Sequence, residues 1–415
     1  GSGPIRGELT AANGRAFSVS GNALYEIFST QLSTNQGTLN SSASIVSMAD
    51  NGFQLAICDG ADLYIFTYAT NVFAKVTDGD FLGGGTVCFL DGYFIVSVPN
   101  SGKFQLCALY DGLAWDALDF ATAESSPDNL NRVSNAVGQL WLHGDRTTEI
   151  WSNVGGSGFA FARISGAKIG QGCVAPHSVI PLDNSIFWIG QDTDGFGIVY
   201  KANGFSPQRI STPAMEFLLQ QVPDLSLLRA YTYQEDGHTF YVVTGAGMTS
   251  TIVFDLSTQE WHERAFLNSS GEFERHLSTC HMFAFGKHLV GARNDGHIYS
   301  MSLSYFDDNG SAIKSQRVFT HLHNEGKFIK LGSLEVDFEG GVGLTNGQGS
   351  DPVCWLEISE DFGRTHGNEM TASIGKLGAY RTRAIWRKLG GAYSFTYRLS
   401  ITDPVKRAIC GAYLS

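Results

Sequence analysis

The chain has 415 residues, of which 43% are hydrophobic and 16% charged, and its formal net charge is −12. This composition excludes a disordered chain, because disorder requires low hydrophobicity and high net charge. Polar residues interrupt every apolar run after a few positions, so no segment is long enough to span a bilayer and no membrane contact is predicted. The 49 glycines and many aromatic residues favour short strands joined by tight turns.

The seven cysteines are scattered along the chain without a C-x-x-C motif. Most of them lie among apolar residues, whereas a disulfide framework needs a dense and paired set. The sequence therefore predicts reduced, buried thiols in a chain made in a cytoplasm.

A repeated pattern of two apolar strands joined by a short turn runs through the first three quarters of the chain. It occurs seven times, at residues 15–28, 53–67, 93–109, 139–152, 185–201, 238–255 and 287–302. Another apolar stretch precedes each pair, and a fourth follows most pairs. Four short strands every 40 to 50 residues are typical of a β-propeller blade. We therefore predict seven blades, or six if the first repeat belongs to another structure.

A polar segment follows the seventh repeat, where a fourth strand would be expected. It contains Asp307, Asp308, Asn309, Gly310 and Ser311. In propellers the other end of the chain often supplies such a strand and so closes the ring. We expect the donor to lie at or before Gly1.

One helix is predicted between the fifth and sixth repeats, as an insertion between blades. Thr212 can cap this helix, Pro213 fits its first position, and Pro223 ends it. The predicted apolar face consists of Met215, Phe217, Leu218 and Leu219.

The repeat of short strands ends near residue 314, and six longer strands are predicted after it. They span residues 316–322, 328–338, 353–358, 380–389, 393–401 and 406–414. About 100 residues in such strands are the size of a β-sandwich. We therefore predict an all-β chain with a propeller at residues 1–312 and a sandwich at 313–415.

Positive charge gathers at the end of the chain. Residues 371–415 contain eight Lys and Arg against Asp403 alone, a net charge of +7, so the other residues carry −19. These cations either solvate the strands or contact an acidic partner or nucleic acid. Sequence-specific DNA recognition is not expected, because no helix can enter a groove and the overall field repels phosphate.

The best candidates for partner binding are Arg381, Arg383, Arg387 and Lys388. Alternation along a strand places the three arginines on one face and Lys388 on the other. Head-to-tail association of the basic end with an acidic neighbour is the predicted use of these charges. Each exposed ion pair contributes only about 0–1 kcal/mol, so an apolar patch must supply the rest.

Three short motifs suggest ligands, but each has a simpler structural interpretation. Residues 170–175 match a dinucleotide fingerprint formally, yet no helix follows them. Residues 192–195 could begin a calcium loop, but two carboxylates fit a hairpin turn better. His321 and His323 share a strand face without a third ligand, which favours surface histidines. The sequence predicts no metal site and no cofactor.

Ser359, Asp361, Gly363 and Thr365 resemble the Asp-box of sialidases. We interpret these residues as a structural hairpin turn, in which the Asp accepts backbone N–H bonds and the Gly adopts positive φ. No G-x-S-x-G, H-E-x-x-H or P-loop motif is present, so no catalytic residue and no enzymatic activity are predicted. A sialidase-like propeller glycosidase and a calcium-dependent adhesive propeller remain the alternatives.

Several stretches of the sequence together resemble the packaged-DNA stabilisation proteins of short-tailed bacteriophages. They are residues 144–152 (GDRTTEIWS), 166–176 (GAKIGQGCVAP), 361–365, 383–390 and 395–403, and the likeness covers nearly the whole chain. The resemblance implies a structural tail-hub or head-closure component of the virion tail or neck, assembled in the host bacterial cytoplasm.

The resemblance also implies partners. Copies of the chain, six in the family, would form a ring below the portal and adaptor. This ring would help retain packaged DNA and receive a tail needle or fibre. Double-stranded DNA would pass the channel without sequence recognition, which suits an acidic propeller because like charge suppresses phosphate binding.

Overall fold

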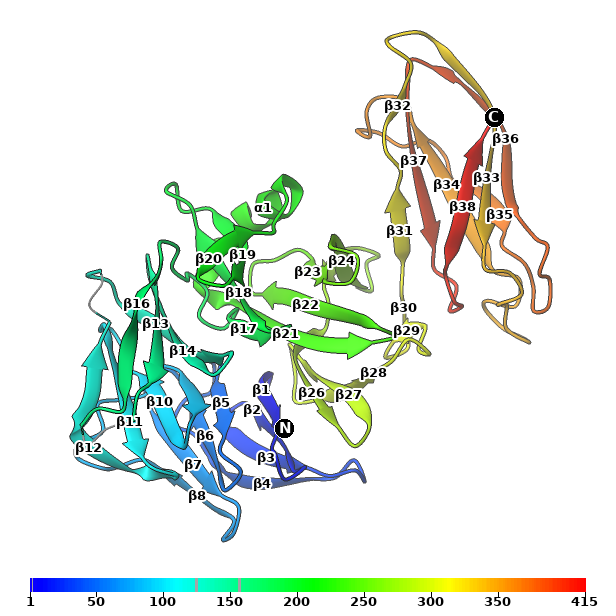
Figure 1. Cartoon of the computed structure of the whole chain (residues 1–415). Coiled ribbons are helices and arrows are strands. Elements are labelled where there is room, and N and C mark those ends of the chain that lie inside the picture. Colours follow the sequence, from blue (N-terminus) through cyan, green and yellow to red (C-terminus); the bar gives the residue numbers. More distant parts are fainter. Residues whose placement is uncertain (2, 124–125, 156–157) are drawn as a thin grey trace. The chain divides into compact units, whose positions relative to one another are not determined.

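The computed structural model describes residues 1, 3–123, 126–155 and 158–415, which divide into two compact units (Figure 1). One unit comprises Gly1–Ala265 and Phe273–Ser302, and the other comprises Phe266–Glu272 and Leu303–Ser415. Antiparallel strands dominate both units, which confirms the predicted all-β fold.

Seven antiparallel sheets make up the first unit within the described residues. The first four contain β1 (Ile5–Thr10), β2 (Ala16–Ser20), β3 (Ala23–Ile27) and β4 (Ser33–Thr38); β5 (Ser47–Asp50), β6 (Gln54–Cys58), β7 (Leu63–Thr67) and β8 (Val72–Lys75); β9 (Val87–Leu90), β10 (Tyr93–Ser97), β11 (Lys103–Ala108) and β12 (Asp111–Thr122); and β13 (Leu130–Ala136), β14 (Gln139–Gly144), β15 (Thr148–Asn153) and β16 (Phe161–Ile169).

The last three sheets follow the same order of strands. They contain β17 (Ile180–Leu182), β18 (Ser185–Gln191), β19 (Gly197–Asn203) and β20 (Ser206–Arg209); β21 (Leu228–Glu235), β22 (His238–Gly245), β23 (Thr251–Asp255), β24 (Glu260–Leu267) and β25 (Phe273–Arg275); and β26 (Ser278–Ala284), β27 (Lys287–Ala292) and β28 (Ile298–Met301).

The first strands of successive sheets contact one another and form a closed ring. The order of contacts is β1, β5, β9, β13, β17, β21 and β26, and β26 returns to contact β1 (Figure 1). These seven sheets are the seven predicted propeller blades. Because the ring is closed, the first strands surround a central axis.

The seventh blade has three strands among the described residues, in agreement with the repeat pattern. Strand β1 pairs with β2 and belongs to the first blade, while the Gly1 amine lies 3.4 Å from the carbonyl oxygen of Gly296. A fourth strand donated from at or before Gly1 stays a prediction. The polar segment after this blade forms a short hairpin of β29 (Asp307–Asp308) and β30 (Ser311–Ala312).

Apolar clusters between neighbouring blades hold the propeller together. Ile65 and Phe94 share one cluster between the second and third blades, and Trp141 and Trp188 share another between the fourth and fifth. All four side chains are buried. The propeller core is therefore divided into a series of sheet-to-sheet interfaces.

The predicted helix is present as α1 (Pro213–Gln220), although the Thr212 side chain makes no capping hydrogen bond. Met215 and Leu219, one turn apart, are buried against the propeller. Phe217 was expected on this face, but it lies on the opposite side and is 61% exposed. No helix among the described residues is long and apolar enough to cross a membrane.

Two sheets form the sandwich. One sheet has the order β31 (Ser315–Val318), β37 (Ser394–Ile401), β34 (Val353–Ser359) and β35 (Met370–Ser373), and β32 (Leu322–His323) also pairs with β37; the other has the order β36 (Ala384–Ala392), β33 (Ile329–Phe338) and β38 (Ile409–Leu414). Five of the six predicted strands match β33, β34 and β36–β38. The first is divided into β31 and β32, and β35 was not predicted.

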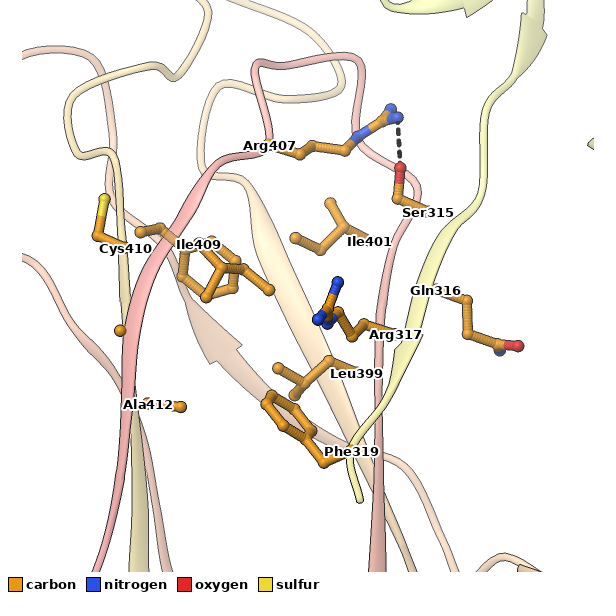
Figure 2. A pocket seen from close by; sticks show the side chains of 12 residues that line it. Ser315, Gln316, Arg317, Phe319, Leu399, Ile401, Arg407, Ile409, Cys410 and Ala412 are labelled. Atoms are coloured by element: carbon orange, nitrogen blue, oxygen red, sulfur yellow. Dashed lines mark hydrogen bonds between the residues drawn. The ribbon is translucent and has the colours of Figure 1, made fainter. Parts of the chain in front are cut away.

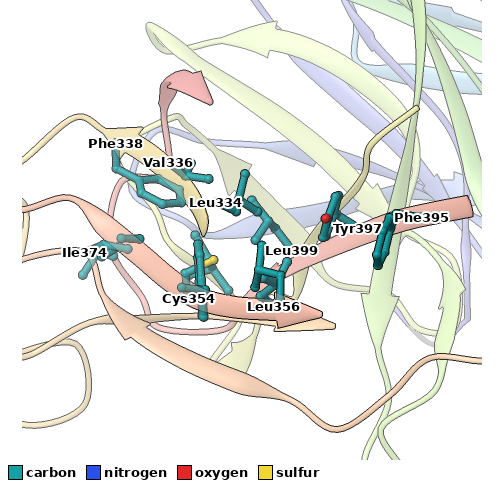
Figure 3. Close-up of a cluster of buried hydrophobic side chains, with 14 of the residues drawn as sticks. Leu334, Val336, Phe338, Cys354, Leu356, Ile374, Phe395, Tyr397 and Leu399 are labelled. Atoms are coloured by element: carbon teal, nitrogen blue, oxygen red, sulfur yellow. The ribbon is translucent and has the colours of Figure 1, made fainter. Parts of the chain in front are cut away.

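A single apolar cluster fills the space between the two sheets of the sandwich. Leu334 and Val336 of β33 face Leu356 of β34 and Phe395 of β37 (Figure 3). All of these side chains are at most 2% exposed. The sandwich is thus stabilised by one core rather than by a series of interfaces.

Candidate partner-docking site

The sandwich is open along the side where β31 and β38 form the edges of their sheets. A cleft of about 550 Å³ lies between these two edge strands (Figure 2). Among the described residues, β31 pairs only with β37, and β38 pairs only with β33. Both strands therefore present unpaired backbone groups next to the cleft, which is how sheet edges accept a further chain.

The floor of the cleft is apolar and its rim carries two arginines. Phe319, Leu399 and Ile401 lie on the floor, and Figure 2 shows Arg317 beside Leu399. Arg407 donates to the Ser315 hydroxyl at 3.0 Å and to the Asp403 carbonyl at 2.8 Å. Burial lowers the pKa of the Arg407 guanidinium, but an arginine remains charged at neutral pH.

Large apolar side chains are exposed along the two edge strands. On β38 Ile409, Tyr413 and Leu414 are 41–60% exposed, and on β31 Val318 is 55% exposed. An apolar centre with aromatic residues and a rim of arginine is the usual composition of a protein interface. The open side of the sandwich therefore has the composition of a docking surface.

The structure places the predicted basic residues on or next to β36. Arg383 and Arg387 are both exposed, and Arg383 precedes the strand directly. The Arg383 guanidinium bonds the Glu335 carboxylate at 2.5 Å and lies 3.3 Å from Asp337. Its charge is therefore neutralised locally, and the hydrogen bond to Glu335 raises the pKa of Arg383 further.

The placement of Lys388 on the opposite face was wrong, because a β-bulge interrupts the alternation. The register between β33 and β36 shifts here, and Lys388 has a φ of +62°. Lys388 is exposed, as Arg387 is, and the next residue, Leu389, is buried. Arg381 lies in a turn before β36 and is also exposed. Arg381, Arg387 and Lys388 make no ion pair with any residue that the structure describes.

Most other cations near the end of the chain are paired with carboxylates of the same domain. These pairs are Arg398 with Glu357, Lys406 with Glu339, and Lys376 with Asp351. Residues 313–415 carry 13 Lys and Arg against 10 Asp and Glu, a net charge of +3, whereas residues 1–312 carry −15. The sandwich is therefore mildly basic and the propeller strongly acidic.

The Asp-box forms the structural turn that was predicted, between β34 and β35. Asp361 accepts the Thr365 amide at 2.8 Å and the Thr365 hydroxyl at 2.6 Å, and Ser359 donates to it at 2.7 Å. These hydrogen bonds hold the pKa of Asp361 well below its usual range. Gly363 has a φ of +85°. The Asp361 oxygens are thus occupied in fixing the turn.

The remaining motifs also have structural explanations. A Cβ atom on Gly172 would lie 2.4 Å from backbone atoms of residues 144–146, so glycine is needed there for close packing rather than for a dinucleotide. Asp192 accepts the amides of Asp194 and Phe196 and forms a hairpin turn. Among the described residues, no three His, Cys, Asp or Glu side chains form a metal-binding group.

The cleft and its arginines, Arg317 and Arg407, were not predicted from the sequence. Both residues lie on short or irregular segments whose position depends on which strands are neighbours in the two sheets. Exposed Cys410, which lines the cleft, differs from the six buried cysteines that were correctly expected. The run of apolar residues without alternation in β38 was the only available signal.

Comparisons with known proteins give one family for both units. A family model described as bacteriophage P22 Gp10, beta-propeller, matches residues 1–305, and one described as bacteriophage P22 Gp10, beta-sandwich, matches residues 314–415. The search of curated proteins found no match.

Solved structures of low sequence identity resemble the chain only loosely. The extracellular domain of a putative one-component system from B. thetaiotaomicron is 9% identical, with a TM-score of 0.48; the match covers 89% of this chain and 46% of that one. PorZ, a surface component of the type-IX secretion system of Porphyromonas gingivalis, is 13% identical, with a TM-score of 0.43 and coverages of 81% and 44%. The N-terminal domain of Nup159 is 10% identical, with a TM-score of 0.44 and coverages of 72% and 88%.

Proposed function

The chain belongs to the bacteriophage P22 Gp10 family of phage structural proteins, and from this premise we propose that it is a tail-hub or head-closure component of the virion. Copies would form a ring below the portal and adaptor, help retain packaged DNA, and receive a tail needle or fibre. The observation that carries the proposal is the match of both units, in the same order, to a phage virion family.

The open side of the sandwich supports a role in assembly. It has exposed apolar edge strands, and the sheet that ends in β38 carries Arg387 and Lys388 on β36 at its other edge, where neither residue forms an ion pair with a described residue. The chemical complement of this surface is an acidic partner with an apolar centre. In our proposal that partner is the acidic propeller of the next copy in the ring, whose net charge of −15 opposes the +3 of the sandwich.

The acidic propeller also suits a channel through which DNA moves. Phosphate backbones are repelled by a surface of the same charge, so DNA would pass without sequence-specific or tight contacts. We propose no enzymatic activity for this chain. The Asp-box that motivated the glycosidase alternative uses its carboxylate to fix a turn.

The assembly proposal can be tested with charge reversals that do not disturb folding. Arg381→Glu and Arg387→Glu are combined, while Arg383 is left intact because it neutralises Glu335 and Asp337. The matched control is Arg364→Glu, an exposed arginine in the β34–β35 turn. After circular dichroism confirms folding, incorporation into purified virions is measured.

We expect the double variant to be incorporated less than the wild type, and the defect to grow at physiological salt, where the remaining charges are screened. The Arg364→Glu control should be incorporated normally. Normal incorporation of the double variant at both salt concentrations would show that these cations only solvate the sandwich. Absence of the wild-type chain from virions would contradict the proposed function itself.

A further inference from the structure

A second cavity lies in the propeller, where the first strands of the blades surround the axis. Its volume is about 230 Å³, and residues of β1, β5, β13, β21 and β26 line it. Water occupies about 30 Å³ per molecule in the liquid, so the cavity has room for a polyatomic ion. Its polar lining includes Glu8, Arg132, His177 and Arg229.

Two arginines line this cavity without an ion pair to any carboxylate of the described residues. Arg229 is 9% exposed and donates to the backbone carbonyls of Ile5 and Arg6. Nη1 of Arg132 donates to the Ser47 hydroxyl at 2.8 Å, and its buried Nε has no hydrogen-bond partner. Carbonyl and hydroxyl oxygens satisfy donors but do not neutralise charge, and a buried uncompensated charge is costly.

Glu8 is the only carboxyl group among the described lining residues, and it does not provide the missing negative charge. Both of its oxygens are buried, and its neighbours are the Cys280 thiol and the Gly291 backbone. Burial raises the pKa of Glu8 to about 8, and the nearby Cys280 thiol and Arg229 guanidinium offset this rise only in part. Burial therefore favours the uncharged acid form of Glu8 over the carboxylate.

His177 lies close to both arginines and does not add a charge of its own. Burial, followed by the charges of Arg132 and Arg229, lowers the pKa of His177 well below its usual value. Its backbone carbonyl accepts the Ala230 amide at 2.9 Å, which fixes it beside β21. The cavity thus presents two guanidinium charges and uncharged hydrogen-bonding groups.

We propose that this central cavity binds a small tetrahedral oxyanion, such as inorganic phosphate, between Arg132 and Arg229. Guanidinium groups match the oxygens of such anions with two parallel hydrogen bonds, and a protonated Glu8 would not repel the anion. Because β13 belongs to the fourth blade and β21 to the sixth, the bound anion links two blades that are not neighbours in the ring. It therefore stabilises the closed ring.

Sulfate is the first probe, because its charge does not change between pH 6 and pH 9. The purified full chain, free of phosphate and sulfate, is titrated by calorimetry, and its melting is followed in sodium sulfate and in sodium chloride of equal ionic strength. A parallel titration uses inorganic phosphate. We expect one anion per chain and a higher melting temperature of the propeller in sulfate than in chloride.

Variants locate the site. Arg132→Gln should weaken binding by about tenfold to a hundredfold, the usual effect of losing a hydrogen bond to a charged group. Arg132→Lys keeps the charge and is the control for a folding defect in Arg132→Gln. Its affinity for the anion should still fall about tenfold, because lysine cannot form the two parallel hydrogen bonds of a guanidinium group. The control Arg163→Gln changes an exposed arginine on β16 and should bind as the wild type.

Raising the pH provides a second readout of the same site. Ionisation of Glu8, which faces Arg229 on β21 and Cys280 on β26, should weaken sulfate binding about tenfold between pH 7 and pH 9. Glu8→Gln cannot ionise and should remove this dependence. Wild-type melting that is equal in sulfate and chloride, or Arg132 variants that bind with unchanged affinity, would overturn the proposal. Neither result depends on whether the chain assembles into virions.

Discussion

The propeller and the sandwich bury their apolar residues in different ways. The propeller closes on itself through contacts between β26 and β1, and its core consists of separate clusters between neighbouring blades. The sandwich has one continuous core and remains open between β31 and β38. Closure removes sheet edges, whereas an open side keeps edges available for a partner. The closed propeller is therefore suited to be a rigid building block, and the open sandwich is suited to contact a partner protein.

The two units also differ in where they place charge. The propeller holds Arg132, Arg229 and His143 in its interior, whereas the core of the sandwich is apolar. Arg383, Arg398 and Lys406 of the sandwich instead form ion pairs with carboxylates of the same domain. We therefore expect the units to respond differently to mutation and to acid.

The largest predicted effect comes from removing one buried phenylalanine in each unit. Phe395 belongs to the sandwich core and Phe94 to a propeller cluster, and both are fully buried. Each change to alanine should cost about 3–5 kcal/mol of the free energy of unfolding. In calorimetry of the full chain, Phe395→Ala should lower only the sandwich transition and Phe94→Ala only the propeller transition. A single transition lowered by both variants would contradict two independent cores.

The next effect concerns the close approach of two backbone segments in the propeller. Gly172→Ala would place a Cβ atom 2.4 Å from the backbone of residues 144–146, so we expect a loss of about 3 kcal/mol in the propeller transition. Gly170→Ala is the matched control, because nothing lies within 4 Å of its Cβ position. Denaturant unfolding of both variants measures the difference. Equal stabilities would mean that Gly172 is not required by packing.

The fold was largely predictable from the sequence, because short stretches of neighbouring residues indicate its strands, turns and helix. Seven repeated hairpins predicted the seven blades, and Thr212, Pro213 and Pro223 predicted α1. The side chain of Glu216 was not expected in the core; it is buried because it bonds Arg209 and Ser211, residues that precede the helix. Such a pair depends on tertiary structure and leaves no periodic signal.

The candidate site was less predictable. Composition identified the basic end of the chain, but the partners of Arg383 come from β33, nearly 50 residues earlier. The bulge at Lys388 could not be foreseen, because lysine does not favour positive φ. The cleft itself depends on the order of strands in two sheets, which alternating hydrophobicity does not specify.

Acid should destabilise the propeller before the sandwich. Burial lowers the pKa of His143 to about 3 and those of His262 and His281 to about 4. A histidine with a lowered pKa contributes its stability above the unfolded value near 6.5, and this contribution is lost as the pH falls below it. For His143 alone the loss is about 2 kcal/mol by pH 5.

The sandwich provides the contrast for this acid response. The hydrogen bond with Arg398 lowers the pKa of Glu357, and the Asp-box lowers that of Asp361. Stability from lowered carboxyl pKa values is present above about pH 4.5 and is lost only below it. Melting curves between pH 7 and pH 5 should show the propeller transition falling and the sandwich transition nearly constant. In His143→Gln the fall should be smaller, and an unchanged slope would exclude His143 as a contributor.

The smallest predicted effect tests the bulge that turns Lys388 outward. The left-handed conformation costs a residue other than glycine about 1–2 kcal/mol of folding free energy. Glycine avoids this cost but loses about 0.5–1 kcal/mol of stability, because its unfolded chain has more conformational freedom. Lys388→Gly should therefore stabilise the sandwich by less than about 1 kcal/mol, as measured by denaturant unfolding. Arg387→Gly, one residue earlier and without positive φ, should instead destabilise it by about 0.5–1 kcal/mol. If both variants lose the same stability, the Lys388 side chain contributes packing that outweighs its strained backbone. If Lys388→Gly is as stable as expected yet is incorporated poorly into virions, its charge serves the partner rather than the fold.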